Sequence, residues 1–283
     1  MTQTMPAQEQ HVQPGRESKM HPAPVYDDPH YKSAGKLQDK VALITGGDSG
    51  IGRATTIAFA KEGARIAIVY LEEDHDARET QQCAQAYGSE VLLIKGDIGD
   101  VAFAKKCVND TFEHFGKLDI LVNNAGEQHT AAEPEDISHE QLLRTFQTNF
   151  FSIVTITLEA LKVMREGASI INTSSITAFK GNPDLIDYSA TKGAITSFTR
   201  SLSTKIVDRQ IRVNSVAPGP IWTPLIPASF SADKVAKFGK DTPMGRPGQP
   251  FELAPAYVYL ASPDSSYVTG QTIHVNGGTV LNG

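Results

Sequence analysis

Two side chains that could transfer a proton lie four residues apart in the sequence. Tyr188 and Lys192 stand at the start of a segment with helical spacing, so both are expected on one face of a helix. A phenol can donate a proton to the alkoxide that forms in carbonyl reduction, or accept one in alcohol oxidation. A nearby cation would help to lower the phenol pKa from about 10 toward neutrality, which requires roughly 4 kcal/mol. The pair could also be a surface tyrosine beside a surface lysine.

Three further polar residues could complete such a site. Ser174 and Ser175 directly follow the β-branched run 169–173, and Asn149 precedes the apolar run 150–156 in another helical segment. A second hydroxyl would hold the carbonyl oxygen beside the phenol. The serines could instead form a turn, and Asn149 could satisfy a neighbouring backbone group. Taken together, these residues predict acid–base chemistry at a carbonyl/alcohol pair.

The elements that must position these residues alternate along the chain. Short β-branched runs predict buried strands at 41–45, 65–70, 90–95, 118–123, 169–173 and 212–216. Helical spacing lies between them, at 52–62, 76–87, 102–115 and 188–207. This alternation predicts an α/β fold of Rossmann type: a single domain, 36–283, with a doubly wound parallel sheet and helices on both faces. Ligands of such sheets bind at the carboxyl ends of the strands.

A glycine-rich turn follows the first predicted strand and opens a helix. Glycines let the backbone approach a ligand closely, and the helix offers unpaired N–H groups to a pyrophosphate. The spacing departs from the commoner G-x-G-x-x-G pattern, and a tight structural turn is the alternative. A nicotinamide dinucleotide would supply the hydride, and its oxidised ring would help to acidify the phenol. The turn residues expected at the cofactor are Gly46, Asp48, Ser49, Gly50, Ile51 and Gly52.

The choice between NAD and NADP depends on the end of the second strand. An acidic residue there would hold a ribose 2′-hydroxyl, and a basic one a 2′-phosphate. Tyr70 and Leu71 are neither, but acidic residues follow at 72–74 and Asp48 lies in the turn, with no lysine or arginine in it. We therefore hypothesise a preference for NAD over NADP.

The ordered series of motifs resembles the short-chain dehydrogenase/reductase family from Lys36 to the end of the chain. Tyr188 lies 13 positions after Ser175, the spacing usual in that family, which selects Ser175 over Ser174. The motifs that carry the resemblance are Thr45-Gly-Gly-Asp-Ser-Gly-Ile-Gly52, Asp97, Asn123-Asn124-Ala125-Gly126, Asn149, Ser175, Tyr188-Ser-Ala-Thr-Lys192 and Pro218-Gly219. The N-terminal extension, the turn and the tail 270–278 resemble a bacterial branch of aldehyde reductases and general-stress oxidoreductases. Two departures are the missing cofactor-selecting residue after the second strand, and Asn276 where aspartate is frequent.

The resemblance implies a role for each matching residue. Tyr188 would be the general acid/base, Lys192 would bind the nicotinamide ribose and lower the tyrosine pKa, and Ser175 would orient the substrate oxygen. Asn149 would hold a water in a proton relay. Contacts to the cofactor would come from Asp97, Ile98, Asn124, Ala125, Gly126, Pro218, Gly219, Ile221 and Thr223. Members of the family are commonly homotetramers that pair through the helices carrying Asn149 and Tyr188.

Composition excludes several function classes. The 283 residues carry a net charge of −6, so nothing drives binding to nucleic acid. The longest apolar runs are too short to cross a membrane, and the first thirty residues lack a secretory signal. The two cysteines are expected to be reduced, no metal site is expected, and a cytoplasmic protein is predicted.

Two segments of the chain each allow two structural interpretations. Residues 1–35 are proline-bearing and lack apolar periodicity, so they predict an extended arm, either disordered or wrapped around a neighbouring subunit through Met20, Val25, Tyr26 and Tyr31. The segment 220–250 predicts a lid over the substrate, or else a partly helical surface excursion. Its apolar residues favour a small, largely uncharged carbonyl substrate. Sugar or polyol oxidation on the same framework and a non-catalytic NAD(P)-binding protein are the alternatives.

Overall fold

The computed structural model describes residues 5–281 and contains one parallel sheet of seven strands. Their order is β3-β2-β1-β4-β5-β6-β7, so the direction of winding reverses between β1 and β4. All neighbouring pairs are parallel. The strands are β1 (Val41–Thr45), β2 (Arg65–Tyr70), β3 (Val91–Lys95), β4 (Ile120–Asn123), β5 (Ser169–Thr173), β6 (Arg212–Pro218) and β7 (Thr272–Val275).

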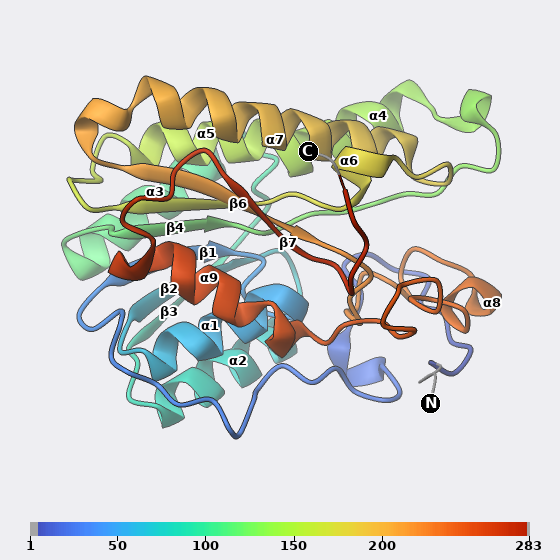
Figure 1. Cartoon of the computed structure of the whole chain (residues 1–283), viewed down its shortest axis with the longest axis horizontal. Coiled ribbons are helices and arrows are strands. Elements are labelled where there is room, and N and C mark those ends of the chain that lie inside the picture. The colour runs from blue at the N-terminus through green and yellow to red at the C-terminus, as the bar shows by residue number, and fades with distance from the viewer. Residues whose placement is uncertain (1–4, 282–283) are drawn as a thin grey trace.

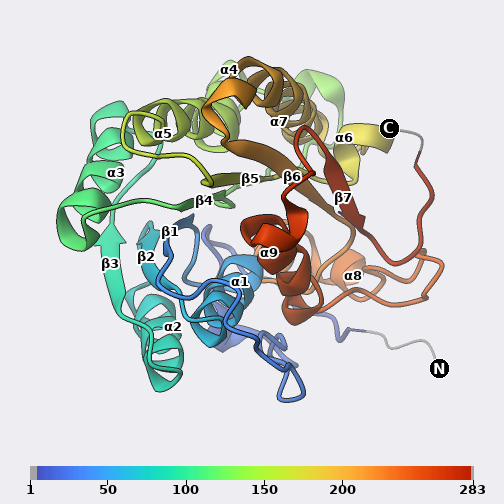
Figure 2. The ribbon, with the colours of Figure 1, turned by 60° about the vertical axis from the view of Figure 1, so that its left-hand side comes forward.

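Helices cover both faces of the sheet (Figures 1 and 2). One layer holds α1 (Gly50–Lys61), α2 (Asp74–Ala86) and α9 (Ala254–Ala261). The opposite layer holds α3 (Val101–Phe115), α4 (His139–Phe146), α5 (Ser152–Ala160) and α7 (Ile186–Lys205). Two short helices, α6 (Thr177–Lys180) and α8 (Ala232–Val235), lie in the connections after β5 and β6. The predicted doubly wound Rossmann-type sheet is therefore confirmed.

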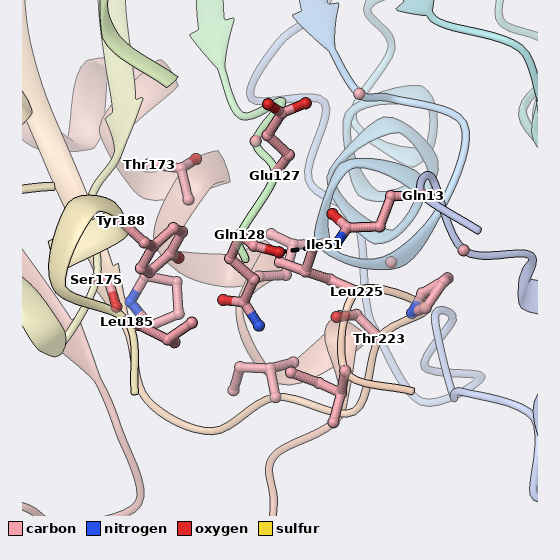
Figure 3. Close-up of a pocket in the computed structure, with 18 of the residues that line it drawn as sticks. Gln13, Ile51, Glu127, Gln128, Thr173, Ser175, Leu185, Tyr188, Thr223 and Leu225 are labelled. Carbon is pink, nitrogen blue, oxygen red and sulfur yellow. Dashed lines mark hydrogen bonds between the residues drawn. The ribbon is translucent and has the colours of Figure 1, made fainter. Parts of the chain in front are cut away.

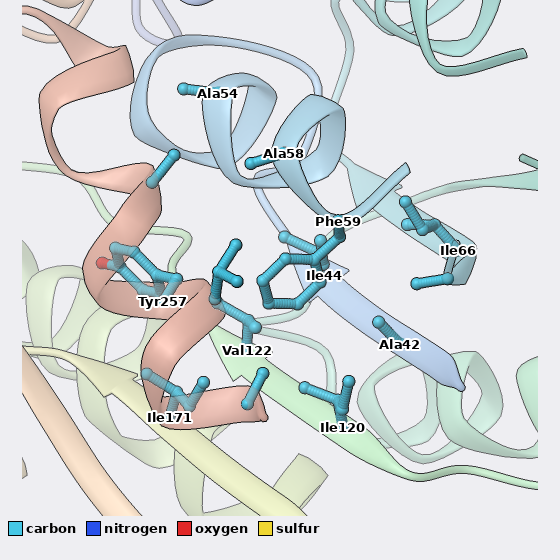
Figure 4. Packing of buried hydrophobic residues seen from close by; sticks show 14 of the residues in the cluster. Ala42, Ile44, Ala54, Ala58, Phe59, Ile66, Ile120, Val122, Ile171 and Tyr257 are labelled. Carbon is cyan, nitrogen blue, oxygen red and sulfur yellow. The ribbon is translucent and has the colours of Figure 1, made fainter. Parts of the chain in front are cut away.

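Along each buried strand the side chains point alternately to the two faces of the sheet, so a hydrophobic core forms on either side. Ala42 and Ile44 of β1 face one layer, and Val41 and Leu43 face the other. Figure 4 shows the first of these cores, in which Phe59 of α1 packs against the strand residues. Removing a fully buried aromatic ring of this kind costs about 3–5 kcal/mol. The two cores hold the carboxyl ends of the strands in fixed positions.

The strand β7 was not among the predicted strands. It lies at the edge of the sheet, next to β6, and each of its four residues is only half-buried. An edge strand with one neighbour does not require the continuous apolar run that marks the central strands. Its pairing with β6 nevertheless fixes the backbone around Pro218, because Gly219 donates its N–H to Val275.

The N-terminal arm lies against its own chain, an arrangement that neither alternative from the sequence described. Met20 is buried beside Trp222, whose indole N–H donates a 2.9 Å hydrogen bond to the carbonyl of Pro22. Tyr31 donates its hydroxyl to Glu62 at 2.5 Å. Val25, one of the four expected anchors, is exposed. The described part of the arm thus packs against its own chain through these contacts, and wrapping around a neighbouring subunit stays a prediction.

The segment 220–250 is fastened to the arm. Trp222, Ile226 and Val235 share a buried cluster with Met5 and Met20 of the arm. A parallel bridge between Ile221 and Gly248 closes the base of the segment. Its only helix among the described residues is the four-residue α8. The lid motion suggested by the sequence stays a prediction.

Candidate active site

A cavity of about 1030 Å³ opens at the carboxyl ends of the strands. Its size is at the upper end of the range for small-molecule and cofactor sites. It is lined by every residue expected at the cofactor or the reacting carbonyl except Gly52 and Asn149. The strand ends converge here because the winding reverses at β1 and β4.

Tyr188 and Ser175 lie on one wall of this cavity (Figure 3). Tyr188 comes from the first turn of α7, and Ser175 follows β5 directly. Ser175 accepts hydrogen bonds of 3.1 Å from the backbone N–H and the hydroxyl of Thr177, which fix its position. Burial raises the pKa of Tyr188 to about 12, and its hydrogen bond with Ser175 opposes this rise.

Lys192 lies one helical turn after Tyr188, with its ammonium 5.3 Å from the centre of the tyrosine ring. The side chain is buried, and Nζ donates a 2.9 Å hydrogen bond to the carbonyl of Thr173. Burial lowers the pKa of Lys192 to about 8. In the chain alone, burial is thus the largest influence on the pKa of Tyr188, and the expected lowering of that pKa by Lys192 and an oxidised nicotinamide stays a prediction. The phenol is neutral at physiological pH.

Asn149 lies in a single turn of π-helix, Gln147–Phe151, between α4 and α5. Turns of π-helix are rare in proteins, and many of those known lie at functional sites. Its side-chain oxygen accepts from the backbone N–H of Glu127 at 2.9 Å, and its amide donates to the Glu127 carbonyl at 2.8 Å. The alternative from the sequence, that Asn149 satisfies a neighbouring backbone group, describes this side chain. Its role in a proton relay stays a prediction.

The glycine turn is shaped to hold a phosphate group. Gly52 has no room for a side chain, since a Cβ there would lie 1.8 Å from the carbonyl oxygen of Gly46. Asn124 fastens the turn from β4 by donating to the carbonyls of Thr45 and Gly46 at 3.2 and 3.1 Å. Within the described range 5–281, the N–H groups of Ile51 and Gly52 have no hydrogen-bond partner. These donors at the start of α1 fit the pyrophosphate of a dinucleotide.

The arm also contacts this turn, which the sequence did not reveal. Glu17 accepts a 2.7 Å hydrogen bond from the N–H of Gly50 and pairs with Arg53 at 3.1 Å. Nearby, Arg16 pairs with Glu73 at 3.1 Å, just beyond the end of β2. The sequence predicts no arginine near this end of the cofactor site. Burial raises the pKa of Asp48, inside the turn, to about 6.

Arg144 is a further charged residue at the cavity that the sequence did not reveal. Arg144 of α4 donates to Asp97 at 2.7 Å and to Glu127 at 3.1 Å, so it joins the segments that follow β3 and β4. No sequence motif marks it. The sequence shows no cluster of basic residues, although Lys180, Lys234 and Lys237 leave an anionic substrate open. The cavity wall includes five lysines: these three, Lys192 and Lys240.

The remaining predicted contacts follow the ends of β2, β3 and β6. Tyr70, the last residue of β2, and Leu71, which follows it, line the cavity. The Tyr70 hydroxyl donates a 2.8 Å hydrogen bond to Asp74. Ile98 lines the cavity after β3, beside Asp97. Thr223 approaches the turn closely, since a Cβ on Gly50 would lie 3.0 Å from its methyl group. The predicted contacts thus surround one continuous space.

Comparisons with known proteins agree with this geometry. A family model described as enoyl-(acyl carrier protein) reductase matches residues 46–280. The uncharacterized oxidoreductase YhxC of Bacillus subtilis (strain 168) is 61% identical over 280 residues, covering 99% of this chain and 98% of the relative. The glucose and ribitol dehydrogenase of Daucus carota is 52% identical over 284 residues, covering 98% of each protein. The chloroplastic NADPH-dependent aldehyde reductase 1 of Arabidopsis thaliana is 50% identical over 282 residues, covering 97% of this chain and 98% of the relative.

A solved structure shows the same fold with a dinucleotide bound. The short-chain dehydrogenase of Burkholderia cenocepacia J2315, in complex with NADP, superposes with a TM-score of 0.80 at 29% identity. The match covers 86% of this chain and 98% of that one. Among the described residues, no helix is long and apolar enough to cross a membrane. The chain therefore belongs to the short-chain dehydrogenase/reductase family of NAD(P)-dependent oxidoreductases.

Proposed function

We propose that this oxidoreductase reduces the carbonyl group of a small aldehyde or ketone to an alcohol, with Tyr188 as the proton donor. The observation that carries the proposal is the meeting of three side chains at the cavity that holds the glycine turn. Tyr188, Ser175 and Lys192 all border this space. The hydroxyl groups of Tyr188 and Ser175 lie on one wall, where both can hydrogen-bond to the same carbonyl oxygen of a substrate.

The reaction needs a hydride at the carbonyl carbon and a proton at its oxygen. When bound, the dinucleotide supplies the hydride. Ser175 orients the substrate oxygen and Tyr188 donates its phenolic proton to that oxygen, which leaves a phenolate to be reprotonated from solvent. The pKa of Tyr188, about 12 in the chain alone, keeps the phenol protonated near neutral pH, so its proton is available for donation. Lys192 supplies the cation beside the phenolate that forms.

The cofactor we propose is NAD rather than NADP. Arg16, the arginine that the arm brings toward the end of β2, is already paired with Glu73. The turn itself carries Asp48, and a 2′-phosphate near it would meet a carboxyl group instead of a basic residue. The relative from Arabidopsis thaliana uses NADPH according to its name. Direct comparison of NADH and NADPH binding is therefore essential.

Sugar or polyol oxidation remains the second candidate. The relative from Daucus carota, named as a glucose and ribitol dehydrogenase, supports it. A homotetramer is proposed as the working assembly, because exposed apolar residues gather on α4, on α5 and in the turn between them: Leu142, Leu143, Phe151 and Leu158.

The proposal is tested by a turnover screen of NADH and NADPH with aldehydes, ketones and sugars, and of NAD and NADP with secondary alcohols. Tyr188→Phe should lower kcat by about 10²–10⁴-fold while dinucleotide binding is retained. Tyr259→Phe, at a tyrosine outside the cavity, is the matched control. Parental activity in Tyr188→Phe would refute the mechanism. Binding of dinucleotide without turnover of any compound would favour the non-catalytic alternative.

A further inference from the structure

The N-terminal arm forms part of the cavity wall. Gln13, Pro14 and Gly15 line the same space as Tyr188 and Ser175. The backbone N–H of Gln10 donates to the carbonyl of Pro227 at 2.7 Å. Gly15 approaches the segment 220–250 so closely that a Cβ would lie 2.4 Å from the carbonyl oxygen of Pro224. The arm is therefore held against the wall by close contacts with its own chain.

Two side-chain amides at this wall each have one buried atom without a hydrogen-bond partner. Among the described residues, the side-chain oxygen of Gln13 and the side-chain nitrogen of Gln128 are both buried and unpaired. Gln128 is 4% exposed, and it also lines the cavity. Leaving a buried polar group without a hydrogen-bond partner destabilises the folded protein. A polar ligand bound in the cavity could supply the missing hydrogen bonds to both groups, which would favour its binding.

The backbone that carries Gln128 is fixed from both sides. Gln13 donates its side-chain N–H to the Gln128 carbonyl at 2.7 Å, the bond drawn as a dashed line in Figure 3. Asn149 holds the preceding residue, Glu127, by its N–H and its carbonyl. In Figure 3 the amide of Gln128 extends into the space between Tyr188 and Ser175 on one side and Leu225 on the other. The amide is thus directed toward the place where the substrate must meet Tyr188.

We propose that Gln13 and Gln128 form a subsite for a hydroxyl group of the substrate, and that the substrate is a hydroxylated aldehyde, a small sugar or the corresponding polyol. A hydroxyl group can accept a hydrogen bond from the unpaired N–H of Gln128 and donate one to the unpaired oxygen of Gln13. A plain aliphatic aldehyde would leave both groups unsatisfied. The inference rests on the proposed reaction at Tyr188, and it names the class of substrate.

Apolar side chains at part of the wall contribute to this selectivity. Leu185, Leu225 and Ile226 line the cavity and offer no hydrogen-bond partner at their positions. A site built to hydrogen-bond a hydroxyl group rejects the analogue that lacks it, because the polar groups of the site are then left unpaired. An apolar site discriminates much less between a compound and its hydroxylated analogue. The arm therefore acts in substrate selection through Gln13.

The test compares erythrose with butanal, two aldehydes with the same carbon chain that differ in their hydroxyl groups. In the full-length protein, the ratio of kcat/KM for erythrose to that for butanal should exceed about 10. It should fall about 10-fold or more in Gln128→Leu and in Gln13→Leu, chiefly through a higher KM for erythrose. Gln8→Leu is the control, because Gln8 lies in the same arm but outside the cavity, where its side chain bonds to the backbone of His21 and Pro6. Its ratio should match that of the parent.

A binding measurement separates failure of the inference from failure of the proposed reaction. Calorimetry of the complex with NADH should show tighter binding of erythritol than of 1-butanol, and Gln128→Leu should abolish the difference. This preference would support the subsite even if the enzyme reduced neither aldehyde, a result that would refute only the reaction. An equal ratio in the parent and both variants, or binding of the two alcohols with equal affinity, would overturn the inference.

Discussion

Glu17 of the N-terminal arm and Arg53 of α1 form an ion pair of 3.1 Å in which neither side chain is more than 4% exposed. Arg53 also lies 2.9 Å from Glu79 and 3.8 Å from Asp76, so one guanidinium faces three carboxyl groups. The second oxygen of Glu17 accepts from Gly50 in the glycine turn. The arm is therefore fastened directly beneath the dinucleotide site by a charge cluster with an excess of carboxyl groups.

This cluster predicts a pH dependence of stability. Burial raises the pKa of Glu17 from 4.5 to about 7. The folded protein then binds more protons than the unfolded chain between these values, so the free energy of unfolding should fall as the pH rises from 4.5 to 7, by up to roughly 3 kcal/mol. Glu17→Gln cannot titrate and should show a flatter profile in urea unfolding. The control is Glu9→Gln, at an exposed residue of the same arm. An identical slope in parent and Glu17→Gln would contradict this account.

Local patterns were sufficient to predict six of the seven strands and most of the cavity. The central strands are buried on both faces, so their apolar runs stand out, as in Ile66–Val69 of β2. Residues that follow strand ends, such as Ser175 and Asp97, could be placed together because parallel strands bring their carboxyl ends to one edge. A residue that directly follows a strand is expected to line the cavity, and the ends of the strands can be predicted from the sequence.

Contacts between distant segments could not be predicted in this way. Glu17 and Gln13 belong to an arm without periodicity, and their partners Arg53 and Gln128 lie far along the chain. Nothing in the composition of the arm distinguishes packing on its own subunit from the two alternatives considered. The pKa of Tyr188 in the chain alone, about 12, could not be predicted from the spacing to Lys192 either, because the cost of burying a phenolate depends on the surrounding protein.

Lys192 predicts the alkaline limit of carbonyl reduction. Burial lowers its pKa from 10.5 to about 8, so its ammonium is present below that pH and is lost as the pH rises through it. At saturating dinucleotide, kcat/KM for the carbonyl compound should fall above about pH 8, approaching one decade per pH unit. Lys192→Arg should move this limb to higher pH, because a guanidinium stays charged. Tyr188 titrates near pH 12 and should not interfere. A parent profile that is flat to pH 9.5 would argue against a required ammonium.

Glu73 predicts how cofactor preference can be changed. It now holds Arg16 at 3.1 Å, beyond the end of β2. Glu73→Gln removes the carboxylate and frees the guanidinium to pair with a 2′-phosphate, so the dissociation constant for NADPH should fall relative to that for NADH, by about 5-fold or more. Arg16→Ala in the same background should cancel the gain. The constants can be measured by fluorescence titration of each reduced cofactor. An unchanged ratio in Glu73→Gln would place Arg16 outside the reach of the ribose.

The apolar surface of α5 predicts the effect of a charge on assembly. Leu158 is 53% exposed on this helix, and Phe151, just before it, is 43% exposed. If copies of the chain pair through this face, an arginine at position 158 must be desolvated in the interface, which costs several kcal/mol without a partner. Leu158→Arg should therefore reduce the mass measured by sedimentation velocity from that of a tetramer to that of a smaller species. Val12→Arg, at an exposed residue of the arm, should leave the mass unchanged. Retention of the parental mass in Leu158→Arg would show that the subunits associate elsewhere, since an uncompensated charge could not be accommodated at a packed apolar contact.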